Sequence, residues 1–181
     1  MIKESDVRCP MSGVGRGSTS DLGLQTPDDA PVTRVAIALG SNIGDREAHL
    51  RYAVDCLAGS LAHLRVSPFI ETEPQHVRPQ PLFLNGALVG DCRLAPRALL
   101  DVLLAIERQR GRERPHVGAP RTLDLDLVLF GDQVVEGPGL TVPHPRFRQR
   151  RFVLEPLAAI APEMIDPVTG LTVRELLVRV R

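Results

Sequence analysis

Two aspartates separated by one residue form the clearest chemical pattern in this chain. Asp124 and Asp126 lie in the run TLDLDLVLF, residues 122–130, which reads as a β-strand. Side chains alternate along a strand, so both carboxylates project from one face and Leu125 from the other. Two like charges about 6 Å apart repel by roughly 3 kcal/mol at an effective dielectric of about 20. A cation should therefore lie beside them, and carboxylate oxygens suit a pair of Mg²⁺ ions.

A bare Asp-x-Asp pattern is more often the solvated end of a strand than a binding site, and this alternative stays open. Val128 and Phe130 extend the predicted aspartate face as apolar side chains. The carboxylates would then lie at the edge of a hydrophobic core, which favours a site.

Arginines precede the strand, at positions 108, 110, 112, 114 and 121. A guanidinium binds phosphate oxygens through parallel N–H groups, and a loop that carries several can close over a triphosphate. Arginine beside metal-binding carboxylates indicates phosphoryl chemistry. For Arg108 and Arg110, a solvated helix end with charges that suit the helix dipole is an alternative.

Two further features suit a substrate site. His144 precedes a second arginine group, Arg146, Arg148, Arg150 and Arg151, and can donate to a phosphate, although a lone loop histidine is more often structural. Phe83 and Asn85 lie two apart on a predicted strand, so a flat ring and an amide face the same way. Such a pair suits a planar nitrogen heterocycle, but phenylalanine in a strand usually belongs to a core.

Hydrophobic periodicity predicts the elements that position these residues. Apolar runs predict strands over 34–40, 63–74, 83–91 and 122–130, and helical spacing predicts helices from Asp45 to Gly59 and from Pro96 to about Ile106. This order, strand-helix-strand-strand-helix-strand, predicts an α+β fold, a ferredoxin-like two-layer sandwich. Two extra helices are expected near 152–160 and 173–178. Residues 1–33 are expected to be a disordered extension and residues 34–181 the folded domain.

Composition narrows the function classes. The chain has 181 residues, with 22 Lys and Arg against 22 Asp and Glu, and therefore no excess basic charge for nucleic acid. Lys3 is the one lysine, which excludes a P-loop kinase. An odd number of cysteines, three, and the lack of an apolar leader or a run of about 18 apolar residues predict a cytoplasmic protein without a membrane anchor.

Six blocks resemble one enzyme family, 6-hydroxymethyl-7,8-dihydropterin pyrophosphokinase of the folate pathway. They are GSNIGD (40–45), TEP (72–74), FLN (83–85), PRTLDLDLVLFG (120–131), LTVPHPR (140–146) and RFVLEPL (151–157). The resemblance runs from about Arg34 to Glu175 and implies a ferredoxin-like core. It also implies transfer of a diphosphoryl group from ATP to the hydroxymethyl oxygen of the pterin, with release of AMP.

The resemblance also assigns roles to residues. It implies that Asp124 and Asp126 bind two Mg²⁺ ions and that Arg112 and Arg121 hold the transferred phosphates. The implied ATP-binding residues are Arg114, Leu127, Thr141, His144 and Arg150. The implied pterin-binding residues are Gly40, Thr72, Phe83, Asn85 and Phe152. We expect a monomer, with a dimer as the alternative.

At four positions, the chain differs from residues that are common in this family: His76, Pro115, Gly118 and Gly139. Lid closure and ATP affinity are therefore expected to differ from those of other members. One rival is an RNA-binding sheet, which the scarcity of aromatics and the strand aspartates oppose. Another is a nucleotidyltransferase, whose Gly-Ser turn should lie close to its Asp-x-Asp, whereas Ser41 is far from Asp124 in the sequence.

Overall fold

A central antiparallel sheet organises the molecule. The computed structural model describes residues 31–74, 80–112 and 119–180. The strand order is β2-β4-β1-β5, and β3 pairs with β4 beyond the end of β2. The strands are β1 (Thr33–Ser41), β2 (Leu61–Val66), β3 (Ile70–Thr72), β4 (Phe83–Cys92) and β5 (Asp124–Phe130).

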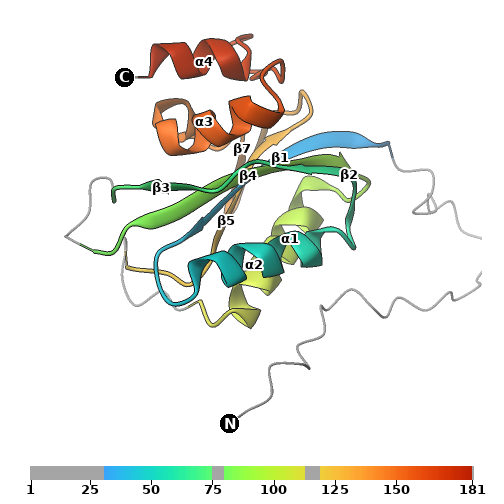
Figure 1. The fold of residues 1–181 in the computed structure, drawn as a ribbon. Coiled ribbons are helices and arrows are strands. Elements are labelled where there is room, and N and C mark those ends of the chain that lie inside the picture. The colour runs from blue at the N-terminus through green and yellow to red at the C-terminus, as the bar shows by residue number, and fades with distance from the viewer. Residues whose placement is uncertain (1–30, 75–79, 113–118, 181) are drawn as a thin grey trace, which may run out of the picture.

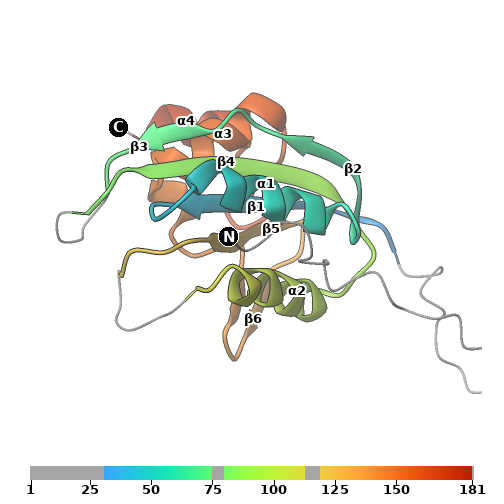
Figure 2. The ribbon, with the colours of Figure 1, turned by 60° about the horizontal axis from the view of Figure 1, so that its bottom comes forward.

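Helices cover both faces of this sheet. α1 (Arg46–Leu57) and α2 (Pro96–Gln109) lie on one face, whereas α3 (Arg151–Ile160) lies on the other with α4 (Val173–Arg179) outside it (Figure 1). A small hairpin of β6 (Val135–Gly137) and β7 (Leu140–Val142) follows β5, and the 3₁₀ helix η1 (Phe147–Gln149) leads into α3. Figure 2 shows β6 extending beside α2, where Arg97 donates a 3.1 Å hydrogen bond to the carbonyl of Pro138.

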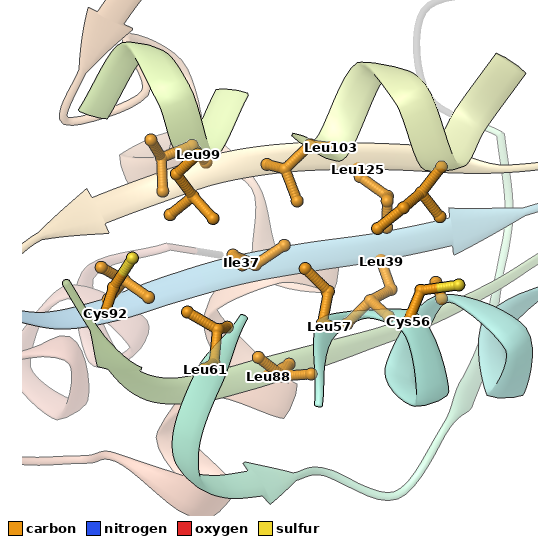
Figure 3. Packing of buried hydrophobic residues seen from close by; sticks show 14 of the residues in the cluster. Ile37, Leu39, Cys56, Leu57, Leu61, Leu88, Cys92, Leu99, Leu103 and Leu125 are labelled. Carbon is orange, nitrogen blue, oxygen red and sulfur yellow. The ribbon is translucent and has the colours of Figure 1, made fainter. Parts of the chain in front are cut away.

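Each face of the sheet has its own hydrophobic core. Alternate residues of β1, β4 and β5 meet α1 and α2, and Ile37, Leu88 and Leu103 are fully buried there (Figure 3). The remaining alternate residues, among them Val89, pack against α3, whose Leu154 lies in the same cluster. The period-2 pattern of β-strands, with both faces apolar, therefore explains why these strands are continuous hydrophobic runs.

Local sequence signals set the ends of the helices. The Asp45 side chain accepts a 3.0 Å hydrogen bond from Ala48 N and so caps α1, as the sequence predicts. Pro96 occupies the first turn of α2, where a missing N–H costs nothing. Thr172 and Glu175 form a reciprocal capping box at the start of α4.

The structure confirms most predicted elements and corrects others. The predicted strand over 63–74 is two strands, β2 and β3. Both pair with β4, and a break at Ser67 and Pro68 separates them. α2 continues to Gln109, so Arg108 is helical and not in the loop. α3 and α4 form a third layer, and the β6–β7 hairpin was not predicted.

Other sequence expectations concern the chain as a whole. Of the predicted extension over residues 1–33, residues 1–30 lie outside the described residues, and its end is corrected because β1 already begins at Thr33. The thiols of Cys56 and Cys92 are both buried. In the described ranges, no helix has the length and apolarity needed to cross a bilayer.

Candidate active site

Three neighbouring strands bring the candidate residues into one row. Gly40 on β1 pairs with Asn85 of β4 on one side and with Asp124 of β5 on the other. A Cβ atom at Gly40 would lie 3.0 Å from Asn85 Oδ1 and 3.8 Å from Asp124 Cβ. The absence of a side chain at Gly40 therefore lets the Asn85 amide and the Asp124 carboxylate lie close to each other over the β1 backbone.

Two arginines hold the Asp124 carboxylate. Arg112 Nη2 lies 2.7 Å from one Asp124 oxygen and Arg121 Nη1 lies 2.6 Å from the other. Arg112 is only 10% exposed and Arg121 is 23% exposed. Charge-assisted hydrogen bonds of this length fix both guanidiniums beside the strand end, where they can receive phosphate oxygens.

A buried glutamate completes this group. Glu107, on the sheet-facing side of α2, is 2% exposed and forms an ion pair with Arg112. Its carboxylate also accepts a 2.7 Å hydrogen bond from the backbone N–H of Leu125. Glu107 therefore links α2, β5 and Arg112, and places Arg112 against Asp124.

Asp126 faces a different pair of residues. Arg150 Nη1 lies 3.2 Å and His144 Nε2 lies 3.7 Å from Asp126 Oδ2. Burial, followed by the negative charge of Asp124, raises the pKa of Asp126 above its usual range against the opposing effect of the neighbouring basic side chains. Lost hydration and the like charge of Asp124 therefore outweigh the neighbouring basic side chains at Asp126.

A β-bulge positions His144. Ala36 pairs with Leu129 and Ile37 with Leu127, so Val128 is an extra residue in β5. The carbonyl of Val128 accepts a 2.9 Å hydrogen bond from His144 N. The bulge therefore brings the histidine-bearing loop to the strand that carries the aspartates.

The bulge also corrects a sequence prediction. The expectation was that Val128 and Phe130 both continue the aspartate face. Val128 does lie in the α3-side core, but Leu129 joins it there, and Phe130 lies in the opposite core with α1 and α2. Two consecutive apolar side chains therefore border the aspartates.

His144 is held in its neutral form. Its Nδ1 accepts a 3.2 Å hydrogen bond from Arg146 N, which assigns the ring proton to Nε2, on the side of Asp126. Burial, followed by the charge of Arg150 and then that of Arg146, lowers the pKa of His144 more than Asp126 raises it. A neutral imidazole with Nε2–H can donate one hydrogen bond to a phosphate oxygen.

An amide and an aromatic ring lie on the other side of Gly40. Asn85 is buried and donates a 2.6 Å hydrogen bond from Nδ2 to Thr72 Oγ1, so its Oδ1 faces Gly40. The guanidinium of Arg121 lies 5.8 Å from the centre of the Phe83 ring. Arg121 therefore contacts both the Asp124 carboxylate, where phosphate oxygens can bind, and the ring of Phe83, a flat apolar surface beside the polar Asn85.

Three of the remaining predicted residues, Phe152, Thr141 and Leu127, lie in the described part of the chain. Phe152, on α3, has the Arg150 guanidinium 5.6 Å from its ring centre. Thr141 is exposed on β7. The Leu127 side chain is buried in the α1–α2 core, so only its backbone can contact a ligand. Arg114 lies outside the described residues, as do His76, Pro115 and Gly118.

The two aspartates fit magnesium only together with a phosphate-bearing ligand. Among the residues that the structure describes, no cluster of three or more His, Cys, Asp or Glu side chains could hold a metal ion. Mg²⁺ commonly takes one or two carboxylates and completes its octahedral shell with water and substrate phosphates. Asp124 and Asp126 provide this set.

Two residues of the site escaped the sequence interpretation. Glu107 follows Leu99, Leu103 and Ile106 on the buried stripe of α2, and a charged residue in that stripe is the signal that points to it. Asn42 is buried and exchanges 2.8 Å and 3.1 Å hydrogen bonds with the backbone N–H and C=O of Arg121. The signal for Asn42 in the sequence is its place in the block GSNIGD, in the turn after β1.

Comparison with known proteins identifies relatives over most of the chain. The family model for 7,8-dihydro-6-hydroxymethylpterin-pyrophosphokinase (HPPK) matches residues 36–162. The 2-amino-4-hydroxy-6-hydroxymethyldihydropteridine pyrophosphokinase of Pseudomonas aeruginosa is 43% identical over 139 residues, which cover 75% of this chain and 85% of the relative. The enzyme of the same name from Synechocystis is 41% identical over 152 residues, 80% of this chain and 74% of the relative.

Longer proteins contain a similar region. The folic acid synthesis protein fol1 of Schizosaccharomyces pombe is 39% identical over 78% of this chain, which spans only 20% of that protein. The crystal structure of wild-type Plasmodium falciparum HPPK-DHPS superposes with a TM-score of 0.65 at 14% identity, over 82% of this chain and 45% of that one. At this identity the superposition supports the fold alone.

Proposed function

Because the chain belongs to the 7,8-dihydro-6-hydroxymethylpterin-pyrophosphokinase family, we propose that it transfers the diphosphoryl group of ATP to the hydroxymethyl group of 6-hydroxymethyl-7,8-dihydropterin. The products are the pterin diphosphate and AMP, and the reaction belongs to folate biosynthesis. Relatives whose names state this activity are matched over most of their length. The remaining parts of the longer relatives are not assigned to this chain.

One observation carries the proposal for the site. Asp124, held between Arg112 and Arg121, lies across Gly40 from Asn85, and Arg121 also faces the Phe83 ring. A phosphate-binding group therefore adjoins a position suited to a flat heterocycle. The alcohol of a pterin bound there and a phosphate held at Asp124 would be close neighbours, as group transfer requires.

The charges of the site favour a magnesium complex of ATP over ATP alone. In the described part of the chain, the carboxylates of Glu107, Asp124 and Asp126 are met by the guanidiniums of Arg112, Arg121 and Arg150. A bare triphosphate would add roughly four negative charges to this balanced group, which two Mg²⁺ ions would offset. We assign these ions to Asp124 and Asp126. When bound, Mg²⁺ neutralises the phosphate oxygens.

The chain's own residues would bind and orient the two substrates. Arg112 and Arg121 would exchange their contacts with Asp124 for phosphate oxygens of the transferred group. Arg150, His144 and Thr141, with the backbone at Leu127 and, by resemblance, Arg114, would hold the nucleotide. Gly40, Thr72, Phe83, Asn85 and Phe152 would hold the pterin.

The reaction needs positioning and charge stabilisation more than a protein base. The hydroxymethyl oxygen of the pterin attacks the β-phosphorus in line, the bond from that phosphorus to the α–β bridging oxygen breaks, and AMP leaves with the bridging oxygen. The hydroxyl proton passes to solvent late in the step. Arg112 and Arg121 stabilise the charge that develops on the equatorial oxygens.

Product analysis with a matched pair of variants tests this function. The wild-type protein, ATP, Mg²⁺ and the hydroxymethyl-dihydropterin should yield AMP and pterin diphosphate. Asp126→Asn should lose activity by at least about a hundredfold, as expected when a group that binds the metal-nucleotide is neutralised. Asp132→Asn, which alters an exposed aspartate two residues beyond β5, is the control. Formation of ADP, or full activity of Asp126→Asn, would contradict the proposal.

Finer features of the protein are also proposed. The core elements β1, α1, β2, β4, α2 and β5 form a ferredoxin-like core, which the antiparallel order β2-β4-β1-β5 supports. α3 and α4 are additions on the second face. Residues 34–181 form one domain that acts in the cytoplasm as a monomer, with a dimer as the alternative.

A further inference from the structure

The segment between β7 and α3 carries contacts in two opposite directions. His144 and Arg150 face Asp126 at the candidate active site. Arg148, on η1 between them, faces away and meets Asp166 in the turn between α3 and α4. The segment therefore joins the nucleotide side of the site to the outermost layer of the fold.

The contact between Arg148 and Asp166 is a two-pronged ion pair. Arg148 Nε lies 2.6 Å from Asp166 Oδ2 and Arg148 Nη2 lies 2.6 Å from Oδ1. The Asp166 side chain is fully buried, and the Arg148 side chain is 23% exposed. Burial would raise the pKa of Asp166, but the hydrogen bonds from Arg148, Thr169 and the N–H of Val168 outweigh it and lower the pKa below its usual range. Asp166 is thus an anion in a fixed position.

Asp166 is held firmly by its own turn. Its carboxylate accepts a 2.6 Å hydrogen bond from Thr169 Oγ1 and a 3.2 Å hydrogen bond from Val168 N. Its backbone N–H donates to Leu171 O at 2.9 Å, and its carbonyl accepts from Gly170 N at 2.8 Å. The turn does not need Arg148 to set the place of Asp166, so the ion pair positions Arg148 more than it positions Asp166.

The segment that carries Arg148 has little regular structure of its own. η1 is a single 3₁₀ turn of three residues, and Arg150 follows it as the residue before α3. The buried ring of Phe147 and the hydrogen bond from His144 N to Val128 O are its other anchors. Arg148 stands two residues from Arg150, so a guanidinium fixed on Asp166 restricts the backbone from which Arg150 reaches Asp126.

We propose that Arg148 and Asp166 are positioning residues for nucleotide binding, which they support by fixing the segment that presents His144 and Arg150. This inference rests on the proposed function, because it concerns the ATP side of that site. Neither residue touches the ligand. Loss of the ion pair should weaken ATP binding more than pterin binding, because of the proposed pterin residues only Phe152, beside Arg150, adjoins this segment.

Three variants and one control test the inference. Arg148→Met, Asp166→Asn and the double variant remove the ion pair in different ways, and Arg148→Lys keeps the charge without the two-pronged geometry. Glu163→Gln breaks an exposed 2.9 Å ion pair with Arg174 in the same layer and serves as the control. The readouts are the Kd of a fluorescent, non-hydrolysable ATP analogue with Mg²⁺, the KM for each substrate, and folding by circular dichroism.

The expected result separates positioning from stability. Arg148→Met and Asp166→Asn should raise the Kd and the KM for ATP roughly fivefold, as is typical of residues that act on a ligand without contacting it. The double variant should show about the same loss as either single variant, because one interaction is removed in all three. Arg148→Lys should fall between these and the wild type, and Glu163→Gln should match the wild type. The KM for the pterin should rise less than the KM for ATP, because Phe152 is the one proposed pterin residue beside the segment.

Several outcomes would overturn the inference. An unchanged Kd in folded variants, an equal rise in both KM values, or loss of folding in all three pair-breaking variants would leave the ion pair with a structural role only. These outcomes are distinct from failure of the proposed function, which would appear as a wild-type protein that forms no AMP.

Discussion

Replacement of Glu107 should separate its two contacts. Glu107→Gln keeps an oxygen that can accept from Leu125 N–H but removes the charge that pairs with Arg112. Glu107→Ala removes both. The first variant isolates the ion pair, and the difference between the two measures the backbone hydrogen bond and the lost packing.

The structure sets the expected sizes of these effects. A hydrogen bond to a charged group contributes about 1.5–3 kcal/mol and a neutral one about 0.5–1.5 kcal/mol, so Glu107→Gln should lower the free energy of unfolding by roughly 1–2 kcal/mol. Arg112 keeps its 2.7 Å contact with Asp124, which limits the loss. Glu107→Ala also leaves the buried Leu125 N–H without an acceptor, at a further cost of about 1–3 kcal/mol.

Urea denaturation and steady-state AMP release measure the two consequences. Both variants should lower kcat/KM by about tenfold or more, equivalent to roughly 1.4 kcal/mol of transition-state stabilisation, because Arg112 loses its ion pair with Glu107. Glu155→Gln alters an exposed helix glutamate that pairs with Arg151 at 3.2 Å and is the matched control. Equal stability of the Gln and Ala variants would refute the assigned hydrogen bond. Full activity of both would refute the role of Glu107 in placing Arg112.

Three further predictions follow from the geometry. Asp126→Asn should raise the melting temperature while it lowers activity by at least about a hundredfold, because burial and Asp124 disfavour the charge that is removed; a lower melting temperature would contradict this account. Gly40→Ala should raise the KM for the pterin by roughly tenfold and leave the Kd of the ATP analogue unchanged, because the new methyl group would lie 3.0 Å from Asn85 Oδ1; equal effects on both substrates would refute it. His49 accepts a 2.8 Å hydrogen bond from Arg110 Nε, and burial, followed by the charge of Arg110, lowers its pKa. Between about pH 6.5 and the lower pKa of His49 in the folded protein, the unfolded chain binds more protons, so the free energy of unfolding should decrease as the pH is lowered through this range. His49→Gln should flatten this slope in urea titrations at several pH values. An unchanged slope would show that other groups cause it.

Strong local signals made much of the fold predictable. The helix cap at Asp45, the proline that opens α2, and the apolar runs of β1, β4 and β5 each depend on neighbouring residues, so the sequence reveals them directly. The short β6–β7 hairpin has strands of only three residues, too short to show a period, although Gly139 with its positive φ marks the turn. The third layer depends on packing between distant segments, which periodicity does not encode.

The candidate site also has parts that the sequence predicts and parts that it does not. Asp124 and Asp126 could be predicted because alternation along a strand is a local rule. The bulge at Val128 could not, because residues 127–130 are all apolar and offer no contrast between the two faces. The contacts of Glu107 and Asn42 with residues far along the chain required the tertiary structure, although the place of Glu107 in an apolar stripe was a usable sign.

The irregularity at Val128 matters for protein engineering. β5 has seven residues, of which the first half presents acidic groups and the second half closes hydrophobic layers on both sides. An engineer who grafted Asp-Leu-Asp alone onto a regular strand of another scaffold would omit the extra residue and the carbonyl that anchors the histidine loop. The transplanted Asp126 would then lack the His144 and Arg150 side chains that face it here. The transferable unit is residues 124–130 together with the segment that begins at His144.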